Sequence, residues 1–342
     1  MILSQTPYRI SFFGGGTDYP EWYRENGGAI LSTTINKYCY ISCRYLPPFF
    51  EHKHRLVYSQ IEDVKNISEI KHRAAKAVMQ YMDVTRGIEI HHDGDLPARS
   101  GIGSSSSFTV GLLNSLYALR GQRISKKDLA SLAIYIEQKI IGEIVGSQDQ
   151  IAASYGGLNH VEFHRDGSFL VNPVIANLDK IQKLSNNLLL FFTGFQRTAE
   201  VIAKSKVDNF DNKKFELRRM QSYVSEGLSI LESTSDNIDH FGPILHESWM
   251  LKRELSSSVT TQRIDEIYVS ALKAGATGGK IIGAGGGGFI LFYVPEEKQA
   301  KVRETLQSLL EVHFEFETGG SRIALYDPKL AGVTSGGTVG KS

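Results

Sequence analysis

The stretch Arg99–Leu119, RSGIGSSSSFTVGLLNSLYAL, places two glycines and four serines directly before an apolar run with helical spacing. The glycines predict a tight turn, and the serines begin a predicted helix over 104–119 that ends at Gly121. Free backbone amides and the positive end of the helix dipole converge where such a helix begins. The loop therefore predicts a binding site for an anion such as a phosphate, and a serine-rich helix cap without a ligand is the competing interpretation.

The composition predicts a large globular protein with no general affinity for polyanions. A chain of 342 residues with 41% hydrophobic and 22% charged positions can bury a sizeable core, and it favours two domains. Lys and Arg number 38 against 37 Asp and Glu, which argues against nucleic acid and anionic membranes as partners. Because we find no leader-like segment, we expect a cytoplasmic protein. Cys39 and Cys43 are predicted to be buried free thiols.

The hydrophobic pattern predicts a mixed α and β chain. Strands are expected at 8–13, 29–46, 87–92, 187–194, 289–294 and 314–326, and helices at 67–82, 104–119, about 125–144, much of 198–273 and 296–310. A break is expected near residue 180. The tail from Ala331 lacks large apolar side chains other than valine and is predicted to be disordered.

Two further glycine clusters compete with the first loop as phosphate binders. The tail segment SGGTVGKS (335–342) resembles a Walker A loop, but a serine replaces its first glycine and no helix can follow it. The cluster GAGGGG (283–288) matches a dinucleotide-binding fingerprint, yet a strand-like segment follows instead of a helix. This second cluster therefore predicts a close backbone approach, either to a ligand or to another segment of the chain.

Three carboxylates stand out in the next part of the chain. Glu137 lies within the apolar stripe of its predicted helix and Glu143 lies on the other flank, so the helical spacing does not choose between them. A helix-edge glutamate that reaches solvent is the alternative for each. Asp149 sits in the polar turn VGSQDQ, where it is a candidate catalytic group or a cap for the helix that follows.

The segments PYRISFFGGGTDYP, LPARSGIGSSSS and KIIGAGGGG stand in the order and about the spacing of the three motifs of the GHMP small-molecule kinases. The resemblance runs from Pro7 to about Tyr326, and within the superfamily the chain is most similar to the D-glycero-D-manno-heptose 7-phosphate kinases, with fucokinase-like members next. It implies a two-domain α+β fold. A ribosomal-S5 domain 2-like domain would span 1–183, a ferredoxin-like domain 184–330, and the disordered tail 331–342.

The resemblance also implies roles for individual residues. Galactokinases carry a magnesium-ligand Glu twelve residues before the catalytic Asp, which here selects Asp149 as the catalytic group and Glu137, rather than Glu143, as the metal ligand. Arg9 falls at the position of a first-motif cation and would face Asp149, keeping it ionised. Ser105 would be the hydroxyl at magnesium. The implied contacts to ATP are Arg99, Gly101, Gly103, Ser104, Ser105, Ser106, Gly285 and Gly286.

The first motif departs from galactokinase in a way that bears on the acceptor. Galactokinases read GEHTDY, whereas this chain reads GGGTDY, so Gly15 and Gly16 remove two side chains. Thr17 and Asp18 remain to contact the sugar, in a site opened for a larger or phosphorylated acceptor. Six cations are candidates for binding an acceptor phosphate, each also explained as a solvated surface charge: Lys37, Arg44, Arg73, Arg99, Arg197 and Lys280.

Together these features predict a kinase that uses ATP and Mg²⁺. Its acceptor would be the anomeric hydroxyl of D-glycero-D-manno-heptose 7-phosphate and its product the 1,7-bisphosphate, for nucleotide-activated heptose and surface polysaccharide. A fucokinase-like kinase of a free hexose, or a non-catalytic sugar and ATP sensor, are the alternatives. The partners are a sugar phosphate and ATP, and the oligomeric state stays open. Tyr58 is a candidate wall of the adenine pocket.

Overall fold

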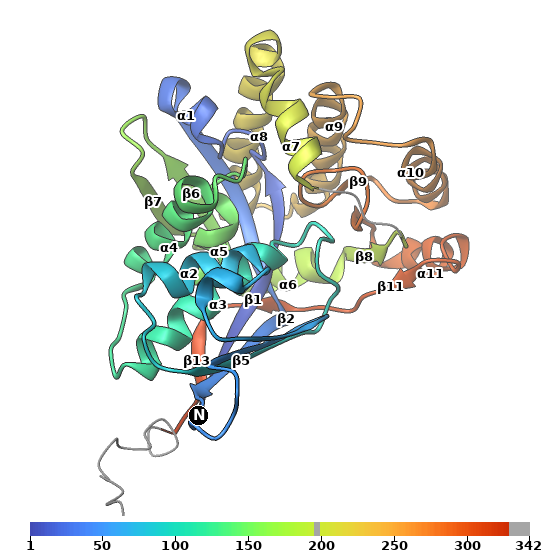
Figure 1. Ribbon diagram of the computed structural model, residues 1–342. Coiled ribbons are helices and arrows are strands. Elements are labelled where there is room, and N and C mark those ends of the chain that lie inside the picture. Colours follow the sequence, from blue (N-terminus) through green and yellow to red (C-terminus); the bar gives the residue numbers. More distant parts are fainter. Residues whose placement is uncertain (195–198, 328–342) are drawn as a thin grey trace, which may run out of the picture.

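The structure, a computed structural model, describes residues 1–194 and 199–327. Two β-sheets carry the fold, each covered by helices (Figure 1). The predicted tail 331–342, with its Walker-A-like segment, and Arg197 lie outside the described residues. Within those residues, no helix is both long and apolar enough to cross a bilayer.

Within the part of the chain that the structure describes, the first sheet contains nine strands, six of them in the order β13-β1-β2-β5-β3-β4. Strands β12 and β6 also pair with β2, and β7 pairs with β6. The long hairpin of β1 and β2 forms its centre, and residues alternate between buried and half-buried at the start of β1 before becoming buried throughout. The strands are β1 (Ile2–Phe13), β2 (Gly28–Tyr45), β3 (His54–Val57), β4 (Ile61–Val64), β5 (Ile88–Gly94), β6 (Asn159–Phe163), β7 (Phe169–Pro173), β12 (Phe316–Glu317) and β13 (Arg322–Tyr326).

Helices from the first half of the chain cover this sheet. They are α1 (Pro20–Asn26), α2 (Arg73–Tyr81), α3 (Ser104–Leu119), α4 (Lys126–Tyr135) and α5 (Gln148–Tyr155). The predicted helix over 104–119 is confirmed and packs against β1 and β2. The helix expected to reach about 144 instead changes after Tyr135 into a π-helical segment, Ile136–Ile141, which Gly142 ends in the left-handed conformation.

The second sheet has four antiparallel strands in the order β11-β8-β10-β9. They are β8 (Leu188–Phe192), β9 (Gly278–Ile281), β10 (Phe289–Tyr293) and β11 (Leu310–Glu311). Along the chain, four helices lie between β8 and β9: α7 (Ala199–Val207), α8 (Lys214–Glu232), α9 (Phe241–Glu254) and α10 (Gln262–Ala274). Helix α11 (Glu296–Thr305) lies between β10 and β11. This order of strands and helices is the βαββαβ arrangement of ferredoxin-like domains, as predicted.

The chain between the sheets differs from the sequence expectations. Helix α6 (Leu178–Asn186) occupies the break expected near 180 and spans the predicted boundary at 183/184. Strands β12 and β13 fall within the predicted second domain, but they pair with β2 and β1 of the first sheet. Local patterns carry no information on pairing between strands so far apart in sequence. The domain boundary itself stays a prediction.

The carboxyl end of β1 lies at the junction between the two sheets. The Phe12 and Phe13 rings contact the Phe241 ring of α9, with centroids 5.2 and 5.0 Å apart. Lys280 of β9 donates from Nζ to the carbonyl oxygen of Phe12 over 2.6 Å. The second sheet therefore holds in place the strand that carries the first motif. Cys39 and Cys43 on β2 are buried free thiols, as predicted.

Candidate active site

An ion pair between Arg9 of β1 and Asp149 of α5 lies at the centre of the candidate site. Arg9 Nε donates to Asp149 Oδ1 over 2.7 Å, and Nη2 donates to Oδ2 over 2.9 Å. Arg9 is 4% exposed, whereas the Asp149 side chain keeps 24% of its surface open. This bidentate geometry fixes the carboxylate and leaves it accessible to a ligand. Asp149 therefore does not cap its own helix, which was the alternative interpretation.

The first turn of α5 reaches three candidate groups with three successive residues. Asp149 binds Arg9, Gln148 Nε2 donates to Asp18 Oδ2 over 2.9 Å, and Gln150 Nε2 donates to Glu137 Oε2 over 2.5 Å. Neither glutamine was predicted from the sequence. The two glutamines flank Asp149 in the segment GSQDQ, and this position was the available sequence signal. Because successive side chains in a helix turn point in different directions, residues on both sides of Asp149 can reach different neighbours of the site.

Glu137 is buried in the π-helical segment, with 1% of its surface exposed. Ser106 donates a hydrogen bond to its Oε2 over 2.9 Å, while its Oε1 is buried with no partner among the described residues. Burial raises the pKa of the Glu137 carboxyl to about 7, although the hydrogen bonds from Ser106 and Gln150 act in the opposite direction. A buried carboxylate oxygen without a donor is a natural ligand for a hard cation such as Mg²⁺.

Glu143, the other glutamate considered, lies near Arg73 Nη1 at 4.0 Å and has 21% of its side chain exposed. Of the three predicted serines, Ser106 contacts Glu137, and Ser105 is exposed in the first turn of α3. The assignment of Ser105 to a metal ion therefore stays a prediction.

The N-terminus of α3 faces the ion pair. Its first residue, Ser104, follows Gly103, which has a φ of 78° and no side-chain cap. A Cβ atom added at Gly103 would lie 3.4 Å from Asp149 Oδ2 and 3.4 Å from Arg9 Cγ. The uncapped amides of this 16-residue helix thus begin beside Asp149, as an anion site requires. Arg99 is exposed at the rim, and its amide donates to Ser104 Oγ.

The glycine-rich loop before α3, which contains Gly101 and Gly103, packs against the glycine-rich loop 283–288. A Cβ atom at Gly101 would lie 2.4 Å from the carbonyl oxygen of Ile282, and one at Gly283 would lie 2.4 Å from that of Gly101. The loop 283–288 also lies close to Val259. A Cβ at Gly285 would clash with Val259, and the Gly286 amide donates to the Val259 carbonyl oxygen over 2.8 Å. The glycines of this loop therefore allow a close approach to other segments of the chain, which is one of the two functions expected from the sequence. Because the Gly286 amide already donates to Val259, it is not free to bind a phosphate.

Replacing Gly101 with alanine should destabilise the protein and weaken nucleotide binding. Gly101 has a φ of 86°, and the added methyl group would clash with a backbone oxygen that has no freedom to move. We expect a loss of about 2–4 kcal/mol in unfolding free energy and at least a tenfold weaker affinity for ADP. Gly121→Ala is the matched control, since its φ is 71° but nothing lies within 4 Å of the new atom. Equal effects of both changes in denaturation and ADP titrations would contradict the packing role.

The first motif forms a turn that presents Asp18. Its carboxylate is 1% exposed and accepts from the Gly16 amide over 2.9 Å as well as from Gln148. Burial raises the pKa of the Asp18 carboxyl, although the hydrogen bond from Gly16 acts in the opposite direction. Gly146 permits this approach, because a Cβ there would lie 1.9 Å from Asp18 Oδ2. Gln148 Oε1 is buried beside it without a partner among the described residues.

The remaining first-motif residues have separate roles. A Cβ at Gly15 would have none of the described residues within 4 Å, so the missing side chain leaves space beside this position. Gly16 differs: its φ is 108°, and a Cβ would press on Leu217 at 3.0 Å. Thr17 is fully buried, and its hydroxyl donates to the carbonyl oxygens of Gly14 and Ala29. Gly16 and Thr17 therefore build the turn, and their contact with the substrate stays a prediction.

The candidate cations are distributed differently from the sequence expectation. Arg44 pairs with Glu89, and Arg73 lies between Glu143 and Glu200. Lys280 is buried at the junction, and two lysines that the sequence analysis did not single out, Lys206 and Lys252, are buried close to it. Lysines are seldom fully buried, and the amphipathic pattern of α7 and α9 alone does not reveal these two.

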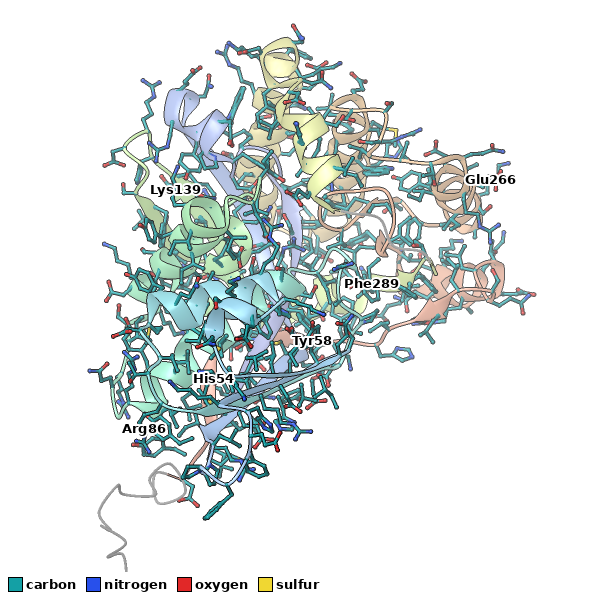
Figure 2. All side chains as sticks on the ribbon, viewed as in Figure 1. His54, Tyr58, Arg86, Lys139, Glu266 and Phe289 are labelled. Carbon is teal, nitrogen blue, oxygen red and sulfur yellow. The ribbon has the colours of Figure 1, made fainter. Side chains whose placement is uncertain are left out.

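Tyr58, the predicted wall of the adenine pocket, is labelled in Figure 2. Its hydroxyl donates to Glu62 over 2.9 Å, and its ring meets His72 edge-on at 5.0 Å. The His72 ring in turn packs against the Phe108 ring of α3, with the ring centroids 4.4 Å apart and the ring planes tilted by 31°. Tyr58 is therefore connected through His72 to the helix that begins at the anion site, and its contact with adenine stays a prediction.

Comparison with known proteins identifies the family. The model described as GHMP kinases N terminal domain matches residues 69–157, and the one described as GHMP kinases C terminal matches residues 231–312, together half of the chain. The chain belongs to the GHMP kinases, with their two-domain fold of mixed helices and sheets. It is a sugar kinase of this family, an enzyme that transfers a phosphoryl group to a hydroxyl acceptor, with ATP implied as the donor.

Individual relatives agree with this assignment. A D-glycero-alpha-D-manno-heptose 7-phosphate kinase of Campylobacter jejuni is 28% identical over 318 residues, covering 90% of this chain and 93% of that protein. A bifunctional fucokinase/GDP-fucose pyrophosphorylase of Arabidopsis thaliana is 26% identical over 92% of this chain, which spans 31% of the plant protein. A crystal structure titled as a D-glycero-D-manno-heptose 1-phosphate kinase of Bacteroides thetaiotaomicron superposes with a TM-score of 0.77 at 23% identity, covering 96% of this chain and 100% of that one.

Proposed function

We propose that this sugar kinase phosphorylates the anomeric hydroxyl of D-glycero-D-manno-heptose 7-phosphate and forms the 1,7-bisphosphate. The observation that carries the proposal is the accessible Asp149 carboxylate, held by Arg9 beside the uncapped N-terminus of α3. An acceptor hydroxyl at Asp149 would face a phosphoryl group bound by the helix amides. The full-length similarity to the Campylobacter kinase and the open space at Gly15 support the phosphorylated acceptor.

The proposed reaction is a direct transfer. The acceptor oxygen forms a bond to the γ-phosphorus while the bond from that phosphorus to the bridging oxygen breaks, and ADP leaves with the electron pair. Asp149 orients the hydroxyl and takes its proton late in the transfer. Arg9 holds the Asp149 carboxylate in one orientation, and the α3 amides compensate charge on the phosphate oxygens.

Mg²⁺ fits the residues present. Glu137 would hold the ion through its unpartnered Oε1, with Ser105 or Ser106 as the neighbouring hydroxyl on α3. When bound, the ion compensates negative charge on the phosphates of ATP. Glu137 itself is kept in place by Gln150, which ties the cation ligand to the same helix turn that carries Asp149.

Release of ADP with Mg²⁺-ATP and a panel of acceptors tests the proposal. We expect turnover with heptose 7-phosphate and little with sedoheptulose 7-phosphate, mannose 6-phosphate, mannose, fucose or galactose. Heptose 1-phosphate belongs in the panel because the names of two relatives differ in the phosphate position. Turnover with fucose or another free hexose alone would favour the fucokinase-like alternative, which the Arabidopsis relative supports. Phosphorus NMR of the product would identify the hydroxyl that is phosphorylated.

A further inference from the structure

Among the residues that the structure describes, buried cationic side chains outnumber buried carboxylates beside the ion pair of Arg9 and Asp149. Four cationic side chains with at most 4% of their surface exposed act on one another electrostatically: Arg9, Lys206, Lys252 and Lys280. Asp18 and Asp149 are the carboxylates in this group. Because both carboxylate oxygens of Asp149 bind Arg9, one carboxylate remains for three lysines. A buried lysine in this group that keeps its proton and has no carboxylate partner calls for an anion.

Two of the three lysines are engaged by the backbone. Lys252 Nζ donates to the carbonyl oxygens of Ile281 and Gly283 over 3.0 and 2.7 Å, so it holds the start of the glycine-rich loop 283–288. Lys280 Nζ donates to Phe12 and holds the end of β1. Burial lowers the pKa of Lys280 to about 7 and that of Lys252 well below its usual range. Both lysines therefore hold backbone carbonyl groups, and their lowered pKa values reduce the positive charge that they bring to the site.

Lys206 on α7 differs from these two lysines. Its side chain is 4% exposed, and among the described residues it makes neither an ion pair nor a hydrogen bond. Its Nζ lies 5.4 Å from the centre of the Tyr19 ring. Burial lowers the pKa of Lys206 to about 8, although Asp18 and Asp149 act in the opposite direction. An ammonium group held near two acidic groups, yet bound to neither, leaves its donors for a ligand.

We propose that Lys206 binds the phosphate of the acceptor and thereby selects a sugar phosphate over a free sugar. The identity of this acceptor rests on the proposed function. The argument that Lys206 binds an anion rests only on the burial and the contacts of Lys206. A phosphomonoester supplies the missing negative charge and accepts the hydrogen bonds that the ammonium group lacks. Asp18 would meanwhile accept from the sugar hydroxyls, and the open position at Gly15 in the same turn leaves room for the ligand.

Lys206→Met tests the proposal because methionine keeps an unbranched side chain, one atom shorter than that of lysine, and removes the charge. We expect the KM for heptose 7-phosphate to rise between about 10-fold and 100-fold, with the KM for ATP unchanged and poor acceptors such as mannose unaffected. Lys204→Met is the matched control, since Lys204 lies on the same helix and is exposed. An equal loss with phosphorylated and free sugars would overturn the proposal and make Lys206 a positioning residue for Asp18.

Melting temperatures provide a readout that needs no turnover. With the nucleotide site filled by a non-hydrolysable ATP analogue, inorganic phosphate should raise the melting temperature of the wild type and of Lys204→Met but not that of Lys206→Met. Lys206→Met alone should melt no lower than the wild type, because it removes an unpaired buried charge. A lower melting temperature, or an equal response of all three proteins to phosphate, would overturn the proposal. If the wild type phosphorylates only free hexoses, the proposed acceptor is wrong, and the phosphate response still decides whether Lys206 binds an anion.

Discussion

Replacing Asp149 with asparagine should lower kcat by about 10²–10⁴-fold while leaving nucleotide affinity within about twofold. Asparagine has the same size but cannot take the proton of the acceptor hydroxyl. Its amide nitrogen also faces the Arg9 guanidinium, which loses one of two hydrogen bonds. Steady-state rates with saturating Mg²⁺-ATP and acceptor measure the first effect, and titration with ADP measures the second.

Asp128→Asn provides the matched control for this change. Asp128 also lies in the first turn of a helix, α4, but it is exposed and its carboxylate accepts from the Ser125 hydroxyl. We expect this variant to keep its kcat and to lose at most about 1 kcal/mol of unfolding free energy. Retention of most of the rate by Asp149→Asn would show that another group takes the proton, and Arg9 and Asp149 would then be a structural pair.

Replacing Glu137 with glutamine should reduce kcat/KM by about 100-fold or more and raise the Mg²⁺ concentration needed for half-maximal rate. The neutral amide keeps an acceptor for Ser106 and Gln150, but it removes the charge that would hold a cation. Glu143→Gln is the control, because Glu143 lies nearby, is partly exposed and contacts Arg73. A Glu137→Gln variant with an unchanged Mg²⁺ dependence would contradict the assignment of Glu137 as metal ligand.

The same substitution should change how stability depends on pH in the absence of metal. The pKa of Glu137 is raised from 4.5 to about 7 in the folded protein. Between these values the unfolded chain releases the proton first, so the Glu137 contribution to unfolding free energy falls as pH rises from about 4.5 to 7. Glu137→Gln lacks this contribution. In denaturant titrations, the unfolding free energy of Glu137→Gln relative to that of the wild type should therefore rise by on the order of 3 kcal/mol between pH 5 and pH 8. An equal pH dependence of both proteins would contradict the raised pKa.

Sequence patterns predicted the elements whose signals are local. The helix over 104–119 begins and ends where the glycines and serines indicate, because capping and helical periodicity act within a few residues. The π-helical segment after Tyr135 was missed, since its apolar spacing continues that of an α-helix. Strands β12 and β13 were recognised as strands but placed with the wrong sheet, because their partners lie some 280 to 320 residues earlier in the chain.

The sequence by itself determined the order of motifs, and with it the family, the candidate phosphate loop before α3 and the candidate residues Arg9, Glu137 and Asp149. These depend on residue type and spacing, which the sequence displays directly. Only the tertiary structure decided which groups lie together. Gln148 and Gln150 lie beside Asp149, Thr17 lies within its turn, and Lys206 lies near Asp18 without an ion pair to any described residue. Burial and electrostatic balance depend on every segment packed around a side chain, and these segments come from both sheets and from distant parts of the chain.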